Sequence, residues 1–390
     1  NDGTLAFNRN DDYTFSGLIV GTGALVQAGS GALILDADNY YTSGTNIESG
    51  TLQIGSGGKS GWITGDVAND GTLAFNRSDA FEFSGKISGT GGFQQKGEGA
   101  VILTGDSSYT GATDVLAGRL AVNGSIGSSI LTRVYEGAEL GGNGTVGQTF
   151  VDGGTLAPGN SIGTLNVVGD LQLTASSTYQ VEVSPTNSDK VNVSGQADLG
   201  GATVQAMFDP GAYIMKRYNI LSANGGLSGT TFGEEVTTDL PENFASLLRY
   251  DANNVYLDLE MSIGGLNVNQ QNVSTALVNY FDENGQIPVA FGALDADGLS
   301  AVSGELATAA QQTTVDAMSQ FMNTLADPLV TGRAGRITKS QVTDASAFEN
   351  RWSVWGAGYG SARSTDGNAT IGSHDTRGRV YGVAVGADYL

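Results

Sequence analysis

The sequence predicts an all-β protein: a right-handed parallel β-helix with a β-rich C-terminal cap, then an amphipathic helical linker and the first strands of a truncated outer-membrane β-barrel. Three observations lead to this fold class. Glycine accounts for 59 of 390 residues, proline for only 6, and charged residues for 15%. Short runs of Val, Ile, Thr, Tyr and Phe alternate with Gly, Asn, Asp and Ser, as expected of short strands joined by tight turns. A long stretch also repeats itself, which indicates stacked structure.

The repeat is ungapped. Residues 1–9 read NDGTLAFNR, and residues 69–77 read the same string. The match continues to Leu52 and its equivalent Leu120. A unit of this kind cannot bury its apolar face alone, whereas stacked copies form one continuous core. Glycine-rich corners allow sharp turns, and each rung covers the sheet edges of its neighbour.

The expected strands are short in the repeats and longer beyond them. In the first copy they cover residues 4–7, 13–15, 24–26, 32–35, 45–47 and 50–54, and residues from about 120 to 170 continue the ladder. From 171 to 260 the strands lengthen and become richer in aromatic residues, as at 177–183, 218–221 and 255–259. Because an open stack needs a closed end, this segment is predicted to be a cap.

The pattern changes after Met261. Residues 269–281 are expected to form a short helix, and the stretch 299–330 has apolar residues at a spacing close to 3.6. We expect one amphipathic helix there, ended by Pro328 and Gly332. The basic residues Arg333, Arg336 and Lys339 follow.

The last residues alternate again. Residues 353–360 and 380–389 each have an apolar, aromatic-containing face opposite a small or polar one, as membrane β-barrel strands do. The polar segment 361–377 is expected to be their connecting loop. A barrel needs at least about eight strands to close, so two strands cannot form a pore. The predicted segments are 1–170, 171–260, 261–348 and 349–390.

Composition excludes several classes of function. The formal net charge is −22, which would repel nucleic acid. The absence of cysteine excludes disulfides, thiolate metal sites and cysteine nucleophiles. No stretch approaches the roughly 20 apolar residues of a membrane helix. No signal peptide is recognisable, and Asn1 begins in mid-pattern, so we expect the export signal to lie upstream.

Several strings, in order along the chain, resemble bacterial autotransporters of type V secretion. The repeats of residues 1–150 resemble passenger-associated repeats. LAPGNSIGTL at 156–165 is similar to a signature near the C-terminal end of passengers, and the strings at 178–195, 218–221 and 254–259 resemble the autochaperone region. SGELATAAQQ at 303–312 resembles the segment before the barrel, and VWGAGYG with GVAVGADY resembles its first two strands.

The resemblance implies a surface-displayed structural or adhesive passenger with its own secretion and folding segment. The β-rich segment would fold first outside the cell and template the solenoid, with Tyr179, Val181 and Val183 in its nucleus. The 299–330 segment would lie in the pore. The implied partners are the outer membrane, its barrel-assembly machinery, and a host surface or other bacterial cells. We expect a monomer at the outer membrane or cell surface, with no nucleic-acid partner, catalytic residues, cofactor or metal.

Few residues are candidates for chemistry. A Ser-His-Asp triad would have to use His374, the only histidine, which falls in a polar loop and is expected to be solvated. Asp36 and Asp38 form a D-x-D pattern, but only Asp38 has a carboxylate, Asp106, at its repeat-equivalent position. One repeated carboxylate does not make an acid–base pair.

Two binding motifs are incomplete. Asp295 and Asp297 with Gly298 resemble half of a calcium loop, but Glu305 is one position short of the bidentate site, so turn residues are expected. The GTG and GSGG strings lack the Lys-Ser/Thr of a phosphate loop and are interpreted as corners. Tyr40, Tyr41 and Trp62 are candidates for a sugar-binding surface, although aromatic residues in a β-helix more often belong to the core.

Two alternative functions stay open at this point. In the first alternative, the chain is the non-catalytic stalk of an enzyme whose active domain lies upstream. In the second, it is a carbohydrate-cleaving β-helix that uses Asp38 or Asp106. A hydrolase motif upstream would favour the stalk. A β-helix is a scaffold that many functions share, so the fold alone does not choose among them.

Overall fold

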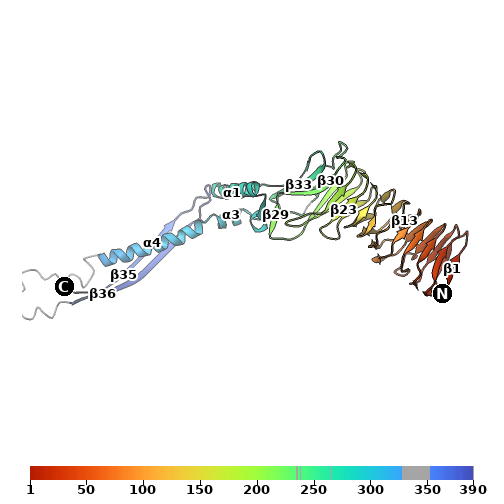
Figure 1. Cartoon of the computed structure of the whole chain (residues 1–390). Helices are drawn as coiled ribbons and strands as arrows, with labels where there is room; N and C mark the ends of the chain where they lie inside the picture. The colour runs from red at the N-terminus through yellow and green to blue at the C-terminus, as the bar shows by residue number, and fades with distance from the viewer. Residues whose placement is uncertain (234–235, 238, 265, 327–351, 390) are drawn as a thin grey trace, which may run out of the picture. The chain divides into compact units, whose positions relative to one another are not determined.

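A computed structural model describes residues 1–233, 236–237, 239–264, 266–326 and 352–389 (Figure 1). These residues group into two compact units. The first contains residues 1–261 and 281–292, and the second contains residues 262–280 and the described residues from 293 onward. The four-segment division drawn from the sequence stays a prediction, because the contacts do not test its boundaries.

The first unit is a parallel β-solenoid, which confirms the predicted fold class. Its strands stack turn on turn: Thr4 pairs with Ala24, and Leu25 with Thr45. A five-stranded sheet contains β1 (Thr4–Phe7), β4 (Ala24–Gln27), β7 (Thr45–Ile47), β9 (Val67–Asn69) and β12 (Ile87–Ser88). A ten-stranded sheet contains β2 (Tyr13–Phe15), β5 (Ala32–Leu35), β8 (Thr51–Ile54), β10 (Thr72–Phe75), β13 (Gly92–Gln95), β15 (Thr113–Val115), β18 (Thr132–Tyr135), β21 (Thr149–Asp152), β24 (Leu171–Leu173) and β27 (Ala197–Asp198).

The remaining faces carry three further sheets. A two-stranded sheet pairs β3 (Val20–Gly21) with β6 (Tyr40–Tyr41). An eight-stranded sheet contains β11 (Phe81–Phe83), β14 (Ala100–Leu103), β16 (Arg119–Val122), β19 (Glu139–Gly142), β22 (Thr155–Pro158), β25 (Thr178–Val183), β28 (Thr203–Phe208) and β31 (Val236–Thr237). A seven-stranded sheet contains β17 (Ser125–Ile126), β20 (Thr145–Val146), β23 (Thr164–Val167), β26 (Lys190–Val193), β30 (Arg217–Ala223), β33 (Asn254–Met261) and β32 (Phe244–Tyr250). Parallel ladders thus continue well past residue 170.

The core fills the solenoid because alternate residues of each strand point inward. In β5, Leu33 and Leu35 are buried while Ala32 and Ile34 are partly exposed. Register keeps like residues in line from turn to turn: Leu33 pairs with Leu52. Burying one such leucine contributes about 1.5–3 kcal/mol, and the stack repeats this contribution in every turn.

The two copies of the sequence repeat occupy different faces of the solenoid. Strand β1 belongs to the five-stranded sheet, whereas its equivalent β10 belongs to the ten-stranded sheet. Likewise β2 lies in the ten-stranded sheet and its equivalent β11 in the eight-stranded sheet. The repeat unit therefore comprises whole turns plus one further face, and the second copy is turned by one face about the solenoid axis.

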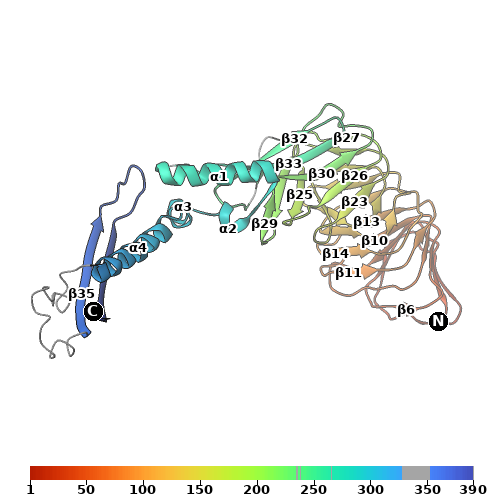
Figure 2. The same ribbon diagram turned by 60° about the vertical axis from the view of Figure 1, so that its left-hand side comes forward.

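The C-terminal end of the solenoid is closed by antiparallel strands (Figures 1 and 2). Strand β30 pairs with β33, and β33 pairs with β32, both antiparallel. A second antiparallel pair joins β29 (Tyr213–Met215) to β34 (Gln286–Pro288), which the short helix α2 (Val289–Gly292) follows. Reversing the strand direction ends the parallel stack, so no further turn continues the seven-stranded sheet.

Helices appear where the sequence changes pattern, with one correction. Helix α1 (Val268–Asn284) confirms the helix expected at 269–281. The single helix expected at 299–330 is wrong: α3 (Ala296–Val302) and α4 (Glu305–Ala326) are separated at Gly304, whose φ is 83°. A positive φ interrupts an α-helix. Pro328, Gly332, Arg333, Arg336 and Lys339 lie outside the described residues. Among the described residues, no helix combines the length and hydrophobicity needed to cross a membrane.

The second unit ends in a long antiparallel hairpin of β35 (Trp352–Thr365) and β36 (Thr376–Tyr389). The connecting loop is shorter than the expected 361–377, because residues at both of its ends join the strand ladder. The apolar faces of the two strands lie on opposite sides. Trp355 is buried with Ala384 against Leu325 of α4, whereas Tyr381, Val383 and Val385 are each 82% exposed.

Candidate functional site

The candidate catalytic aspartates Asp36, Asp38 and Asp106 make structural contacts within the solenoid and do not form an acid–base pair. Asp36 accepts a hydrogen bond from the Ser56 hydroxyl (2.5 Å), and Asp38 accepts one from the Gly61 amide (3.0 Å). Asp38 forms a β-bridge with Trp62 beside the two-stranded sheet, whereas its equivalent Asp106 bridges Ser125 of the seven-stranded sheet. Because the repeat is turned by one face, these two carboxylates do not share a surface.

The half calcium loop is the start of a helix. Asp295 is the N-cap residue of α3, and its Oδ1 accepts a hydrogen bond from the Gly298 amide (2.8 Å). Asp297 lies in the first helical turn, where a negative charge is favourable. The side chain of Glu305 lies outside the described residues. His374 is exposed in the loop between β35 and β36.

The three aromatic residues considered for sugar binding separate into core and surface. Tyr41 is fully buried, and its hydroxyl hydrogen-bonds the Thr45 hydroxyl at 2.6 Å. Burial raises the pKa of Tyr41 to about 12. Tyr40 is 48% exposed, and its ring meets that of Trp62 edge-on, with the ring centroids 5.3 Å apart. The sequence pattern could not separate these roles for adjacent tyrosines, but strand alternation does.

The string LAPGNSIGTL at 156–165 covers the end of β22, a loop at 159–163 and the start of β23. The buried side chain of Asp189 hydrogen-bonds this loop. The carboxylate of Asp189 accepts hydrogen bonds from the amides of Gly163 (2.7 Å) and Glu182 (2.9 Å). Gly159 has a φ of 90° and its carbonyl accepts a hydrogen bond from Arg119 (3.1 Å). Asp189 is 1% exposed, so one buried carboxylate joins the loop to β25.

The environment of Asp189 perturbs its ionisation. Burial raises the pKa of Asp189 to about 7, opposed by the two backbone hydrogen bonds and assisted by the negative charges of Glu182 and Asp209. A carboxylate whose pKa lies so far above its usual value favours the protonated form in the folded state. The sequence analysis missed this residue. The feature of the sequence that could have identified Asp189 is its position: a charged residue immediately before the alternating strand β26, where a loop meets the predicted cap.

The predicted folding nucleus is buried at the closed end of the solenoid. Tyr179, Val181 and Val183 are fully buried along one face of β25. The Tyr179 ring stacks on Phe232, with centroids 5.3 Å apart and planes 2° apart, and its hydroxyl donates to the Ile220 carbonyl. Tyr179 therefore joins β25 to both β30 and the segment that contains Phe232.

An ion pair fastens the antiparallel strands to the stack. Arg217 of β30 and Asp258 of β33 form a bidentate pair (2.6 and 2.5 Å), and the Arg217 guanidinium lies 4.9 Å from the centre of the Tyr256 ring. This bidentate geometry is the strong form of an Arg–carboxylate contact. Together with the Tyr179 contacts, this pair links the antiparallel strands of the closed end to the parallel stack.

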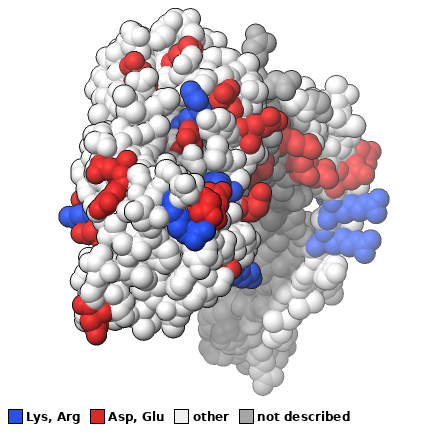
Figure 3. Space-filling view, turned by 90° about the vertical axis from the view of Figure 1, so that its right-hand side faces the viewer, with Lys and Arg blue, Asp and Glu red and all other residues white. Residues whose placement is uncertain are grey.

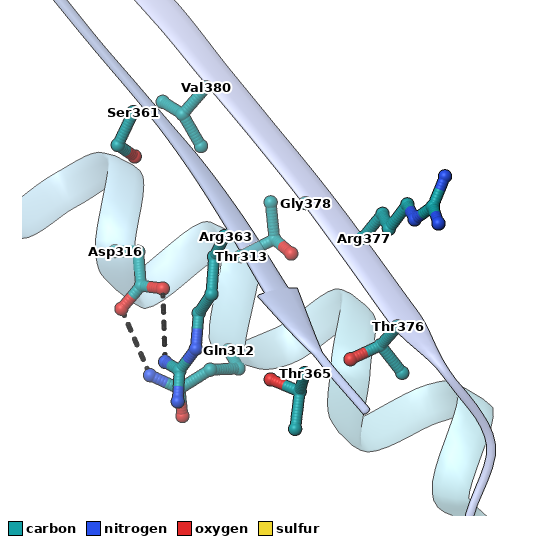
Figure 4. A pocket seen from close by; sticks show the side chains of 10 residues that line it. All are labelled: Gln312, Thr313, Asp316, Ser361, Arg363, Thr365, Thr376, Arg377, Gly378 and Val380. Atoms are coloured by element: carbon teal, nitrogen blue, oxygen red, sulfur yellow. Dashed lines mark hydrogen bonds and ion pairs between the residues drawn. The ribbon is translucent and has the colours of Figure 1, made fainter. Parts of the chain in front are cut away.

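In the second unit, a polar groove of about 300 Å³ lies between α4 and the hairpin (Figure 4). Asp316 of α4 accepts a hydrogen bond from Gln312 (3.0 Å) and pairs with Arg363 of β35 (3.5 Å). Gln320 donates to the Ser361 hydroxyl, and Phe321 lies against Tyr359. Hydroxyl, amide and ionic contacts along one helix face thus bind α4 to the inner face of the hairpin.

Charge is dispersed over the solenoid surface. Figure 3 looks toward its N-terminal end, where acidic side chains lie singly or in small groups among neutral ones. Some of them are structural: Asp2 accepts hydrogen bonds from the amide and hydroxyl of Thr22, and the equivalent Asp70 does the same for Thr90. These bonds lower the pKa of Asp2 and Asp70. The acidity thus partly serves to join neighbouring turns.

Comparison with known proteins identifies the repeated unit. The passenger-associated transport repeat matches residues 25–54 and 93–122, which are equivalent segments of the two copies. An extracellular serine protease of Serratia marcescens is 32% identical over 182 residues, which cover 42% of this chain and 17% of the protease. The adhesin BmaC autotransporter of Brucella suis biovar 1 is 40% identical over 193 residues, covering 45% of this chain and 5% of the adhesin.

A more distant relative covers more of the chain. The autotransporter lipoprotein NalP of Neisseria meningitidis serogroup B is 25% identical over 267 residues, or 61% of this chain and 24% of NalP. The chain thus matches between 5% and 24% of the length of these relatives. What the relatives share with it is the passenger region, while their printed names describe both a protease and an adhesin.

Proposed function

Because this chain contains an autotransporter passenger region, we propose that it is a surface-displayed, non-catalytic passenger stalk whose C-terminal part directs its own secretion and folding. Autotransporter passengers are displayed at, or released from, the bacterial outer membrane, and this is the localisation of the chain. The observation that carries the proposal is the closed end of the solenoid, where parallel turns terminate on the antiparallel strands β30, β33 and β32.

A closed end of this kind can start folding because its contacts do not depend on turns further toward the N-terminus. Strand β33 pairs with β32 through a short connection and with β30 on its other side, and Tyr179 joins this region to the solenoid. Each parallel turn, in contrast, pairs only with adjacent turns, so it needs a formed neighbour as a template. The segment 171–260 would therefore fold first outside the cell, and the solenoid would grow from it toward Asn1.

The second unit fits the proposed secretion role. The outer face of β36 exposes Tyr381, Val383 and Val385, as a lipid-facing strand does, and the inner face of the hairpin holds α4 through polar contacts. We propose that the hairpin is part of an outer-membrane barrel and that α4 lies inside it. The barrel-assembly machinery is the partner that this role requires.

Deleting residues 171–260 tests the folding role. We expect the remaining solenoid to refold far more slowly than the full chain after dilution from denaturant, measured by far-UV circular dichroism. As a matched control, a chain lacking residues 1–68 removes a segment of similar kind from the other end and should refold at the full rate. Equal refolding rates for the full chain and the 171–260 deletion would refute the proposal.

Proteolysis of intact cells tests the topology. Cells expressing the full-length parent gene are treated with protease and probed with an antibody against residues 1–170. Release of the passenger, with the hairpin region retained in the outer membrane, is the expected result. Protection of residues 1–170 in intact but not in lysed cells would contradict surface display.

A second function is favoured by one comparison. The similarity to the Serratia marcescens extracellular serine protease suggests that this chain is the stalk of a secreted enzyme whose catalytic part lies elsewhere in the parent protein. Protease activity of the secreted parent, retained when residues 1–170 carry surface substitutions at Asp38 and Asp106, would favour this alternative. Loss of polysaccharide cleavage in those variants would instead support a carbohydrate-cleaving β-helix.

A further inference from the structure

The two copies of the repeat differ around the bridge between Asp38 and Trp62 of the first copy. The bridge between Asp38 and Trp62 has its equivalent in the bridge between Asp106 and Ser125. Likewise Tyr40 has its equivalent in Ser108. The second copy thus makes the same backbone bridge with serine at both positions, so the bridge does not require the aromatic pair.

A longer loop accompanies the aromatic pair. Between β8 and Trp62 the first copy has the segment GSGGKSG at residues 55–61, whereas between β16 and β17 the second copy has only residues 123–124. The loop is held in place by Arg77, which is 7% exposed. Arg77 donates hydrogen bonds to the carbonyls of Gly61 (2.5 Å) and Lys59, and also pairs with Asp79 (2.9 Å). Because a buried arginine holds this additional loop in one position, the surface beside Trp62 is ordered before any ligand binds.

The polar ends of the aromatic pair are available for a ligand. Among the described residues, neither the Tyr40 hydroxyl nor the Trp62 indole N–H makes a hydrogen bond; Tyr40 is exposed and Trp62 is partly exposed. The two rings are nearly perpendicular, at 78°, so they present one ring face and one ring edge. The carboxylate of Asp38 is 48% exposed beside them, and that of Asp36 lies next to the Ser56 hydroxyl.

This combination fits the chemistry of a sugar ring. A pyranose presents axial C–H groups that pack on an aromatic face, and equatorial hydroxyls that donate to carboxylates and accept from an indole N–H or phenol. The surface lacks the enclosed apolar cavity that a hydrophobic small molecule needs. Its two carboxylates are balanced locally by Arg77, which lies 3.9 Å from the Asp38 carboxylate, and by Lys59 of the loop, so the surface offers no excess of positive charge for a sulfated, sialylated or nucleic-acid ligand.

We propose that Tyr40, Trp62, Asp36 and Asp38, supported by the 55–61 loop, form a binding site for a neutral oligosaccharide. This inference rests on the proposed role as a surface-displayed passenger and supplies its ligand class. Tyr40 and Trp62 contact the sugar ring, the two aspartates bind its hydroxyls, and Arg77 positions the loop without touching the ligand. Leu18 and Val20, which are 60% and 46% exposed on the preceding turn, extend the surface along the solenoid.

The test is binding of cellohexaose, laminarihexaose and mannohexaose to the purified full chain, measured by isothermal titration calorimetry. Binding of at least one neutral hexasaccharide is expected, without binding of sialyllactose. The double variant Tyr40→Ser/Trp62→Ser gives the first copy the residues of the second copy, so it should fold. We expect it to weaken binding at least tenfold, or about 1.4 kcal/mol.

A matched control removes an exposed apolar residue elsewhere. Ile130 is 71% exposed, and Ile130→Ser should bind the same hexasaccharide as the unsubstituted chain does. Unchanged thermal unfolding of both variants shows that the solenoid is intact. No binding of any of the three hexasaccharides, preferential binding of sialyllactose, or undiminished binding by the double variant would overturn the proposal. Because this assay uses purified protein, its failure is distinguishable from failure of surface display, which proteolysis of cells measures.

Discussion

The nonapeptide NDGTLAFNR occurs twice in this chain, in two different surroundings. In the first copy β1 pairs with β4 in the described residues, whereas in the second copy β10 lies between β8 and β13. Phe75 is fully buried, but the equivalent Phe7 is partly exposed. Identical sequence therefore forms the same strand in both places, while stacked neighbours decide how much of it is buried. In a solenoid, the energetic value of a residue depends on the turns above and below it.

The largest effect expected from this comparison concerns the two phenylalanines. Phe75→Ala removes a ring packed against Phe81, Phe83 and Phe93, and should lower the free energy of unfolding by about 3–5 kcal/mol. Phe7→Ala should cost less, because Phe7 is partly exposed. Urea unfolding of the two variants measures the difference. Equal losses would show that burial in the stack does not set the contribution.

The two arginines at the end of the nonapeptide give a polar version of the same comparison. Arg77→Ala leaves the carbonyls of Lys59 and Gly61 without their donor and should cost about 1–3 kcal/mol. Arg9 makes an exposed pair with Asp11 (2.6 Å), and Arg9→Ala should change stability much less than Arg77→Ala, because solvent screens the exposed pair. Thermal unfolding of the two variants tests this. A loss for Arg9→Ala as large as that for Arg77→Ala would contradict the argument.

Asp189 contrasts with Arg77, because it is a buried charged group whose hydrogen bonds come from backbone amides and not from an oppositely charged side chain. Its folded-state pKa of about 7 exceeds the ordinary aspartate value, so its stabilising effect is complete below about pH 4 and is lost as pH rises toward 7. Stability should therefore fall by on the order of 2 kcal/mol between pH 5 and pH 8. Asp189→Asn cannot ionise and should flatten this slope, as chemical unfolding at the two pH values will show. A slope unchanged by the substitution would assign the pH dependence to other groups.

A small and similar effect is expected at Tyr41 and at its repeat equivalent Tyr109. Tyr41 and Tyr109 are both fully buried, and each hydrogen-bonds a threonine hydroxyl at 2.6 Å. Tyr41→Phe and Tyr109→Phe should each cost about 1 kcal/mol, because each leaves one buried hydroxyl with a partner removed. Equal shifts in thermal unfolding are the expected result. A large difference between them would mean that the face of the solenoid, and not only burial, affects the bond.

The strands of the solenoid could be located from sequence with little error, because their alternation and their glycine corners are local. The long helix could not, since Gly304 sits within an otherwise continuous apolar periodicity and its positive φ is a matter of backbone geometry. The hairpin strands extend into the segment expected to be a loop because cross-strand pairing continues through polar residues such as Arg363 and Arg377. Periodicity alone carries no information on such pairing.

The sites were less predictable than the strands. Asp36, Asp38 and Asp295 were identified from sequence as carboxylates of interest, yet each bonds nearby backbone or hydroxyl groups. Arg77 and Asp189 were missed because their importance lies in buried contacts with residues far along the chain. The separation of Tyr40 from Tyr41 follows from strand alternation, but only once the strand and its inward face are known.

The sequence by itself determined that this chain stacks: a duplicated unit with alternating apolar residues and glycine corners has no other way to bury its core. The tertiary structure alone decided how the copies are turned. The repeat does not span a whole number of turns, so equivalent residues such as Asp38 and Asp106 fall on different faces. The number of residues in a turn depends on corner geometry and loop length, which local composition does not fix. The aromatic pair Tyr40 and Trp62 therefore lies on a different face from its counterparts Ser108 and Ser125 in the second copy.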